Sequence, residues 1–312
     1  MKLLRRNLKK RKAKRAVYYF VIGMLSVMRG YNILIVILAQ YLTSIFIFRP
    51  DQLVKNTLFD VHLFLTVLAS SLVVAAGYII NSFYDVEVDR INKPIKSRID
   101  SFVSKEIKLK TYFVLNFTGV VLGAFVSWRA AFFFVLYIFL IWLYSHKTKK
   151  KPILRALFSS MLAMLPFFVI FVYHKNISLL IFTHAAFLFC IILTRELIKQ
   201  LESVRGDFVH NYKSIPVVYG ERVTKIIITT TVVVALIPIY GLWQYAEIGK
   251  MHYYFYLVFV LLVIFVPALW IARSIRHYNI LHNVLKAIIV LGVFSLSLID
   301  TFVLIKRLLQ TL

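Results

Sequence analysis

The chain contains nine apolar runs, each close to the roughly 20 residues that a helix needs to cross a lipid bilayer. Hydrophobic residues make up 61% of the 312 residues and charged residues only 16%, against about 25% charged residues in soluble domains. The sequence therefore predicts an all-α integral membrane protein with about nine transmembrane helices. The expected spans are residues 32–48, 61–81, 111–127, 130–145, 157–173, 177–197, 226–245, 252–272 and 285–305.

The basic residues are distributed unevenly among the segments between these runs. With the N-terminus placed in the cytoplasm, 31 of the 38 Lys and Arg residues fall on the cytoplasmic side, which is the distribution that the positive-inside rule describes. This rule explains the net charge of +25 without nucleic acid as a partner. We expect residues 1–30 to form a basic arm and interfacial segment on membrane lipid, and residues 31–312 to form the transmembrane domain.

Three oxygen-bearing side chains, Asn81, Asp85 and Asp89, recur every four residues at the cytoplasmic end of the second span. Residues at this spacing lie near one face of a helix. Carboxylates in one row repel each other unless a cation lies between them, and hard oxygen ligands suit Mg²⁺. The row predicts a Mg²⁺ site that also binds phosphate oxygens of a substrate. The alternative explanation is a solvated acidic face.

The loop after this row carries positive charge. Arg90, Lys93, Lys96 and Arg98 surround Pro94, which ends any helix before it. Cations beside an acidic row suit a polyanionic ligand whose charge exceeds what the metal neutralises. Each of these residues alone is also explained as an ordinary positive residue of a cytoplasmic loop.

Two hydroxyl side chains, Tyr144 and Ser145, lie at the cytoplasmic end of the fourth span. Hydroxyl groups at a helix end can reach phosphate oxygens of a bound substrate. Tyr at this depth is more often an anchor at the membrane interface, so the pair has two possible roles.

A second polar row ends the sixth span at its cytoplasmic end. Its members share a helical face and are Glu196, Lys199, Gln200, Ser203 and Asp207. Ionisable residues at membrane depth are costly, and they are usually functional. Two such rows on one side of the membrane predict a joint polar site.

Taken together, these residues resemble the UbiA superfamily of intramembrane prenyltransferases over most of the chain. The first aspartate motif with its Arg-x-Asn-Lys-Pro tail is the specific part of the likeness. The resemblance rests on Arg29…Asn32 before the first span, Asn81-x-x-x-Asp85-x-x-x-Asp89-Arg-Ile-Asn-Lys-Pro94 after the second, Tyr144-Ser145 after the fourth, and Arg195-Glu-Leu-Ile-Lys199…Gly206-Asp207 with Ile215-Pro216…Gly220 around the sixth and seventh.

The resemblance implies a UbiA-like bundle of nine helices, with an active site on the cytoplasmic side and a lateral opening for an isoprenoid tail. It implies a place in a bacterial or archaeal inner membrane. It further implies Mg²⁺-dependent transfer of a geranylgeranyl-like group from a polyprenyl diphosphate to a hydrophobic, lipid-like acceptor such as geranylgeranylglyceryl phosphate.

The resemblance also implies roles for individual residues. The implied catalytic residues are Asp85, Asp89, Lys199 and Asp207. The implied diphosphate-binding residues are Arg29, Asn32, Lys93, Tyr144, Ser145 and Lys199. The implied Mg²⁺ ligands are Asn81, Asp85, Asp89 and Asp207, with Glu202 and Glu196 as possible helpers.

The second row departs from the family branch that it most resembles, the geranylgeranylglyceryl-phosphate geranylgeranyltransferases. That branch typically carries further aspartates where this chain has Gln200 and Ser203. Either the second Mg²⁺ is held more weakly, or the substrate differs, or activity is reduced.

Other functions stay open from the sequence. One is prenylation of an aromatic acceptor, such as a quinone precursor, or of haem. Another is a transporter or lipid-binding protein with a polyanion site, which broken helices near the bilayer midplane would favour, whereas both polar rows lie at helix ends. A third is a non-catalytic family member, suggested by Gln200 and Ser203.

Overall fold

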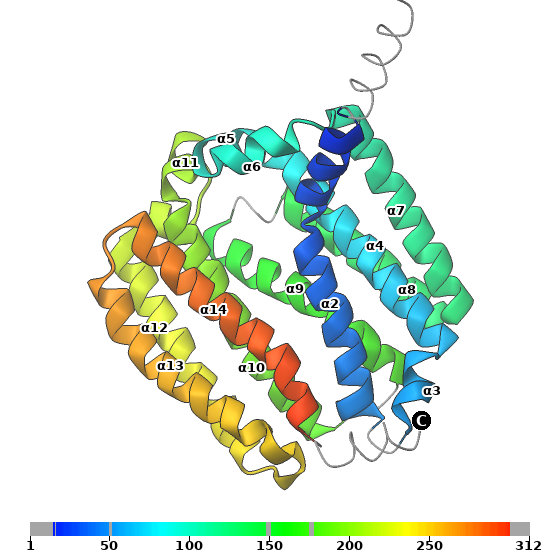
Figure 1. Cartoon of the computed structure of the whole chain (residues 1–312). Coiled ribbons are helices and arrows are strands. Elements are labelled where there is room, and N and C mark those ends of the chain that lie inside the picture. Colours follow the sequence, from blue (N-terminus) through cyan, green and yellow to red (C-terminus); the bar gives the residue numbers. More distant parts are fainter. Residues whose placement is uncertain (1–14, 16, 50–51, 148–150, 175–177, 300–312) are drawn as a thin grey trace, which may run out of the picture.

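The computed structural model describes residues 15, 17–49, 52–147, 151–174 and 178–299, and these residues form helices and connections without a strand. Nine of the described helices are long and apolar enough to cross a membrane, which confirms the number of spans that the sequence predicts (Figure 1). They are α2 (Gly30–Thr43) with η1 (Ser44–Phe48), α4 (Val61–Tyr84), α7 (Lys105–Val126), α8 (Trp128–His146), α9 (Pro152–His174), α10 (Leu179–Glu202), α12 (Ile215–Trp243), η3 (Ala246–Met251) with α13 (His252–Ile271), and α14 (Ile275–Ser295) with η4 (Leu296–Leu298).

Short helices connect the spans. One is α3 (Val54–Leu58), and three others, α5 (Val86–Asn92), α6 (Pro94–Asp100) and α11 (Val204–Val209), lie side by side at one end of the bundle (Figure 1). We call this end the α5–α11 end. An apolar helix, Val17–Met28, precedes α2, and it falls within the expected interfacial segment. The basic arm expected before it lies, for residues 1–14, outside the described residues.

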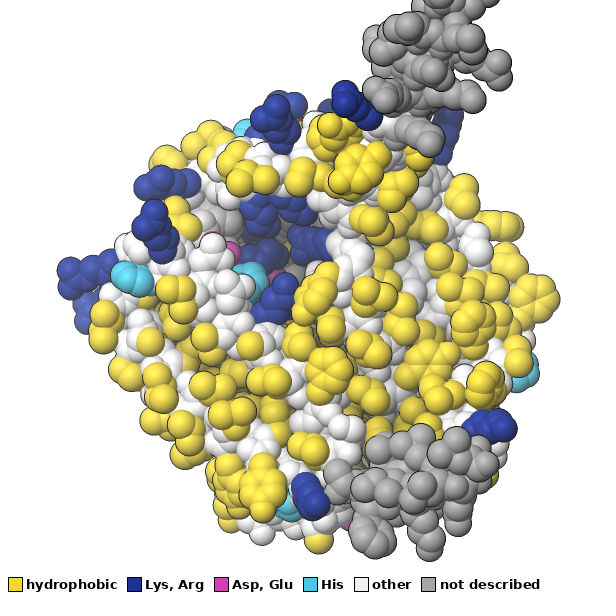
Figure 2. All heavy atoms as spheres, viewed as in Figure 1, with side chains coloured by type: hydrophobic (Ala, Val, Ile, Leu, Met, Phe, Trp, Pro, Cys, Tyr) yellow, Lys and Arg dark blue, Asp and Glu magenta, His cyan; other side chains and the backbone are white. Residues whose placement is uncertain are grey.

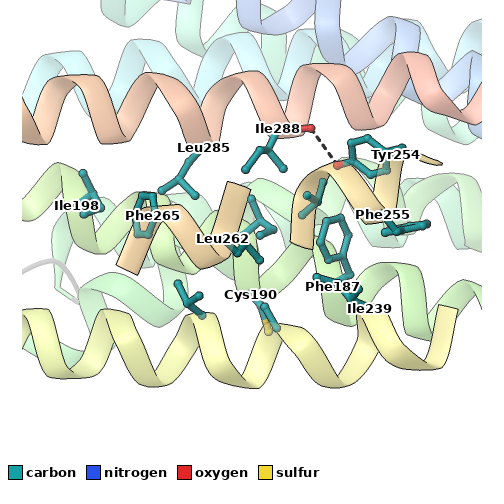
Figure 3. Packing of buried hydrophobic residues seen from close by; sticks show 14 of the residues in the cluster. Phe187, Cys190, Ile198, Ile239, Tyr254, Phe255, Leu262, Phe265, Leu285 and Ile288 are labelled. Carbon is teal, nitrogen blue, oxygen red and sulfur yellow. Dashed lines mark hydrogen bonds between the residues drawn. The ribbon is translucent and has the colours of Figure 1, made fainter. Parts of the chain in front are cut away.

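Most of the buried hydrophobic side chains among the described residues belong to two large cores. One core packs α2, η1, α4, α7, α8 and α9, and the other packs α10, α12, α13 and α14. Figure 3 shows part of the second core, where the Tyr254 hydroxyl of α13 donates a 3.0 Å hydrogen bond to the Ile288 carbonyl of α14. Its labelled side chains come from α10 (Phe187, Cys190, Ile198), α12 (Ile239), α13 (Tyr254, Phe255, Leu262, Phe265) and α14 (Leu285, Ile288).

Glycines bring α7 into close contact with its neighbours. A Cβ on Gly119 would lie 2.8 Å from Cγ2 of Val73 in α4, and one on Gly123 would lie 2.6 Å from Phe134 in α8. Helices in a membrane associate through van der Waals packing, so small residues at the interface let the backbones approach. These contacts place α4, and with it the first polar row, firmly in the bundle.

Local signals fix where the helices begin. Several helices start with a side-chain oxygen that accepts the amide hydrogen of the third residue beyond it, as N-caps do. The capping residues are Asp60 (α4), Ser104 (α7), Ser127 (α8), Ser178 (α10) and Ser274 (α14).

The expected start of the last span, at residue 285, is wrong, and its expected end at residue 305 lies outside the described residues. Helix α14 begins at Ile275, and the described part of this span ends at Leu298. Tyr278, Leu281 and Leu285 recur at helical spacing and are buried, while polar residues occupy the other face. The stretch is therefore an amphipathic helix, and a search for a continuous apolar run overlooks it.

At the opposite end of the bundle, Asp60 joins three spans. Its carboxylate accepts hydrogen bonds from Arg49 Nη1 at 2.8 Å, from the Tyr173 hydroxyl at 2.7 Å and from the Leu63 amide at 3.1 Å. Burial alone would raise the pKa of Asp60, but the hydrogen bonds from Tyr173 and Leu63 and the Arg49 charge hold this pKa below its usual value.

Asp60→Asn is expected to destabilise the detergent-solubilised protein by about 1–2 kcal/mol at neutral pH. A depressed pKa means that the stabilisation by Asp60 is complete above the ordinary aspartate pKa of about 3.9 and is lost as the pH falls through the lower folded-state value. Thermal unfolding between pH 7 and pH 3 should therefore show the two proteins converging in acid. Glu106→Gln, which removes an exposed carboxylate, is the control, and a pH-independent difference would contradict the expectation.

Candidate active site

The residues of the first polar row are connected by consecutive i→i−4 backbone hydrogen bonds. The backbone departs from helical geometry at Asp85, with φ −95° and ψ 6°, yet amide hydrogen bonds run from Asp85 to Asn81, from Asp89 to Asp85 and from Lys93 to Asp89 at 2.8–3.0 Å. Asn81, Asp85, Asp89 and Lys93 therefore follow one another at intervals of one turn. The sequence spacing predicts this arrangement.

The end of α8 meets this row. Ser145 Oγ donates a 3.0 Å hydrogen bond to Oδ1 of Asn81. The neighbouring Tyr144 is buried, and it interacts electrostatically with Glu196, Arg155 and Asp85. The structure thus brings Tyr144 and Ser145 to the polar rows.

The start of α2 reaches the same region through Tyr78, which lies one turn before the row. Arg29 lies over the Tyr78 ring at 5.0 Å, and Asn32 Nδ2 donates to the Tyr78 hydroxyl at 3.3 Å. Arg29 has a left-handed backbone with φ 53°. A residue other than glycine in this conformation is strained, and such strain tends to concentrate at functional sites.

Two residues of the second polar row, Glu196 and Asp207, are buried carboxylates that form ion pairs. Lys199 Nζ lies 3.0 Å from both carboxylate oxygens of Glu196. Arg155, at the start of α9, donates from Nη1 and Nη2 to the two oxygens of Asp207 at 2.8 and 3.3 Å. The Asp207 carboxylate, a predicted Mg²⁺ ligand, is fully buried, so this pairing with Arg155 compensates its charge.

One side chain joins the two rows. Asn92 Nδ2 donates to the Ser203 carbonyl at 3.2 Å, and Asn92 Oδ1 accepts the Gly206 amide hydrogen at 3.0 Å. A Cβ on Gly206 would lie 2.5 Å from Asn92 Nδ2, so the contact requires glycine. Segments more than 100 residues apart in the chain therefore meet at the α5–α11 end, as the prediction of a joint polar site requires.

Electrostatic interactions confirm this proximity. Burial raises the pKa of Tyr212, and the charges of Asp85 and Asp207 raise it further, so Tyr212 lies near both rows. Burial also lowers the pKa of Lys93. The Asp89 charge opposes this effect, and the neighbouring cations Lys199 and Arg29 add to it.

The surface at this place is hollowed and basic. Figure 2 shows a hollow between α2 and α14, beneath α5 and α6, with Lys and Arg side chains on its walls and acidic side chains at its base. A site with these charges suits a polyanion, because the cations attract it and the low-dielectric walls strengthen that attraction.

Two polar residues of α10 have partners outside the rows. The Gln200 side chain accepts the Ile215 amide hydrogen at 3.1 Å, so it caps the beginning of α12. Glu202 lies 2.9 Å from His282 Nδ1 of α14. Within the described residues, the Gln200 side chain therefore has a structural partner, the backbone amide of Ile215.

The sequence reasoning overlooked Arg155 and His282 as partners of predicted site residues. Arg155 precedes the expected span 157–173, and His282 precedes the expected span 285–305, so the sequence predicts both residues in cytoplasmic loops. The helical spacing of Tyr278, Leu281 and Leu285 is the signal that could have placed His282 on α14. Nothing in the sequence connects Arg155 with Asp207, because their pairing depends on tertiary structure.

The donor set of the first row fits Mg²⁺. No cluster of three or more His, Cys, Asp or Glu side chains suited to a metal is found among the described residues. Mg²⁺ needs only one or two carboxylates when water and substrate phosphates complete its shell. Asp85 and Asp89 meet that requirement, and the Asn81 amide oxygen, which accepts from Ser145, keeps a second lone pair.

The chain matches the sequence profile of the UbiA prenyltransferase family over residues 52–280. It is similar to a protein named digeranylgeranylglyceryl phosphate synthase from Methanobrevibacter smithii, with 25% identity over 72% of this chain and 79% of that protein. A protein of the same name from Saccharolobus solfataricus is also 25% identical, over 77% of this chain and 83% of the relative.

Solved structures share the fold. One, described as that of digeranylgeranylglyceryl phosphate synthase in membranes, superimposes with a TM-score of 0.68 and 21% identity, covering 88% of this chain and 96% of the other. A UbiA homologue from Archaeoglobus fulgidus bound to DMAPP and Mg²⁺ gives a TM-score of 0.66 at 15% identity, covering 90% and 99%.

The contact between the two rows can be tested by a double-mutant cycle. Asn92→Ala is expected to cost about 1–3 kcal/mol because it leaves a buried amide and carbonyl without partners. Gly206→Ala should also destabilise, because its new Cβ meets the Asn92 side chain. The double variant should lose less stability than the two single variants lose together, since removing the Asn92 side chain makes room for the new Cβ of residue 206.

Thermal unfolding in detergent measures all three proteins. Gly241→Ala is the control, because a Cβ there would make an ordinary 3.4 Å contact with Thr183 and should cause no loss of stability. Strictly additive losses would show that Asn92 and Gly206 do not interact directly.

Proposed function

From the premise that the chain belongs to the UbiA prenyltransferase family, we propose that it transfers a geranylgeranyl-like group from a polyprenyl diphosphate to a lipid-like acceptor such as geranylgeranylglyceryl phosphate. The chain is an integral membrane prenyltransferase of UbiA type. The observation that carries the proposal is the meeting of the two polar rows through Asn92, because it gathers the acidic and basic groups of both rows into one site. The names of the archaeal relatives support this acceptor class.

Asp85 and Asp89, with the Asn81 amide oxygen, would hold Mg²⁺. When bound, Mg²⁺ supplies a Lewis acid that neutralises charge on the leaving diphosphate. Asp207 stays a proposed ligand of a second ion. Each carboxylate oxygen has two lone pairs, so Arg155 and a metal can share this group.

Arg29, Lys93 and Lys199 would bind the diphosphate. As the allylic carbon–oxygen bond breaks, negative charge grows on the departing oxygen, and fixed cations stabilise it without having to reorganise. Mutual repulsion among these cations is relieved when the anion binds. Glu196 orients Lys199 by accepting from its ammonium group.

Side chains around the rows would position the substrate and exclude water. Ser145 fixes the Asn81 amide, and Asn32 with Arg29 holds Tyr78. Apolar helix walls beside the hollow suit the isoprenoid tail, and a dry site protects the allylic cation from attack by water.

The orientation in the membrane is part of the proposal. The α5–α11 end would face the cytoplasm, and residues 1–30 would lie on lipid there. The support is the excess of Lys and Arg in the segments at that end, as the positive-inside rule describes.

Asp85→Asn and Asp89→Asn are each expected to reduce turnover roughly 100-fold or more, because each removes charge from the proposed metal site without changing its shape. Release of diphosphate from radiolabelled geranylgeranyl diphosphate, in vesicles with Mg²⁺, measures the loss. Glu87→Gln is the matched control, since Glu87 lies between the two aspartates but forms an exposed pair with Arg90. Near-normal turnover by either aspartate variant would refute the metal-site assignment.

The acceptor can be identified with the same assay. Geranylgeranylglyceryl phosphate, a quinone precursor and haem are supplied separately to the wild-type protein, with Mg²⁺ or with a chelator. We expect product only with the glyceryl phosphate and only with Mg²⁺. Product with the aromatic acceptor alone would assign the chain to a different branch of the family.

A further inference from the structure

A second basic cavity lies at the α5–α11 end, beside the candidate active site. It has a volume of about 610 Å³ and is bounded by the end of α10, the start of α11, the start of α12 and the start of α14. Three arginines, Arg205, Arg273 and Arg276, line it. We call it the arginine cavity. Its lining includes Glu202 but none of the residues of the first polar row.

One side of the arginine cavity is held by a buried network. Lys225 Nζ donates to the Ala272 carbonyl at 2.6 Å and lies 2.8 Å from Glu221 Oε1. The Tyr278 hydroxyl donates to Glu221 Oε1 at 2.7 Å. Lys225 and Tyr278 are each about 5% exposed or less, so α12, the α13–α14 connection and α14 are fixed relative to one another.

The charges of the cavity do not cancel. Of its two acidic residues, Glu221 pairs with Lys225, and Glu202 Oε1 lies 2.9 Å from His282 Nδ1 without forming a hydrogen bond. Two carboxylates, one of them paired with a lysine, therefore face three arginines. None of the three arginine side chains forms an ion pair with a described residue. Other cations at this end do have carboxylate partners, as Lys96 has Asp100 and Lys110 has Glu106.

The arginine cavity has the chemistry of a phosphate site. The planar guanidinium group of Arg donates in a fork that matches phosphate oxygens. The first turn of α14 lies on the cavity wall at Ser274 and Ile275, and the amino end of a helix favours negative charge. Within the described residues, the three arginines that line the cavity have no ion-pair partner, so the cavity attracts anions.

The surroundings point to a lipid as the source of the phosphate. Ile271, at the end of α13, is 74% exposed, and Ile275, in the cavity lining, is 43% exposed. Exposed apolar residues at the end of a membrane span suit contact with acyl chains, and basic pockets between spans suit anionic head groups.

We propose that the arginine cavity binds the phosphate group of an anionic membrane lipid at a site separate from the catalytic hollow. The lipid head group contacts Arg205, Arg273 and Arg276, and its chains lie along the exposed ends of α13 and α14. This proposal is independent of the proposed acceptor, because no step of the transfer reaction uses these arginines.

Lipid binding to the full-length protein in detergent tests the proposal. Native mass spectrometry compares dioctanoyl phosphatidylglycerol, which is anionic, with dioctanoyl phosphatidylcholine, whose phosphate is balanced by choline. The triple variant Arg205→Ala, Arg273→Ala, Arg276→Ala should bind phosphatidylglycerol roughly 100-fold more weakly than the wild type, from about 1 kcal/mol per arginine near a membrane surface. The wild type should bind phosphatidylcholine more weakly than phosphatidylglycerol.

A matched variant removes three other cations from the same end of the bundle. Lys105→Ala, Lys110→Ala, Arg222→Ala carries the same change in net charge, and its positions lie outside the cavity lining. Its affinity for phosphatidylglycerol should stay within about threefold of the wild-type affinity, since long-range attraction alone is screened by salt. Equal losses in the two triple variants would overturn the proposal, because general basicity would then explain binding.

Two further measurements complete the test. Arg205→Lys, Arg273→Lys, Arg276→Lys keeps the charge but loses the guanidinium fork, so its affinity should fall between the wild type and the alanine variant. This lysine variant also tests the proposal if the alanine variant does not fold, which the absence of cooperative thermal unfolding would show. Inorganic phosphate is titrated as a competitor, and displacement of the lipid at equal concentrations would overturn the lipid assignment in favour of a free phosphate ligand.

Discussion

The structure depends on how ionisable groups are compensated where helices leave the apolar interior. A buried charge is costly without a partner, and a half-satisfied network is worse than an apolar one. At the α5–α11 end, Arg155 neutralises Asp207 and Lys199 neutralises Glu196. Asn92 then joins the two polar rows through backbone groups rather than charges. These contacts involve four helices, α5, α9, α10 and α11.

This arrangement separates two kinds of cation. Some are paired and structural, as Arg155 is, while others are crowded together without enough negative charge. Lys199 and Arg29 repel the Lys93 ammonium group, although Asp89 and Glu196 offset part of the charge of Lys93 and Lys199. Arg205, Arg273 and Arg276 line a second cavity. Crowded cations store electrostatic energy that a bound anion releases. In the two proposals made above, the hollow is the place of the transfer reaction and the arginine cavity binds a membrane lipid.

The candidate site was only partly foreseeable from the sequence. The spacing of Asn81, Asp85 and Asp89 is a local property, and the i→i−4 ladder reproduces it. The sequence predicts Gln200 as a member of the second polar row and as a departure from the family branch, whereas in the structure its side chain caps α12 at Ile215. Asp207 is predicted as a Mg²⁺ ligand, and the sequence does not reveal that Arg155 pairs with it. The expected last span begins ten residues after the observed start of α14, because the first half of this helix buries one face and exposes polar residues on the other.

The sequence by itself determined the number of spans, the helical class and the two polar rows, because hydropathy and helical spacing act over a few residues. Only the tertiary structure decided which partners those rows have. Asn92 meets Gly206, Arg155 meets Asp207, and Glu202 meets His282, each across 50 or more residues of chain. Such pairings follow from how separate helices pack, and the energy of a buried polar group is set by the partner that packing brings to it.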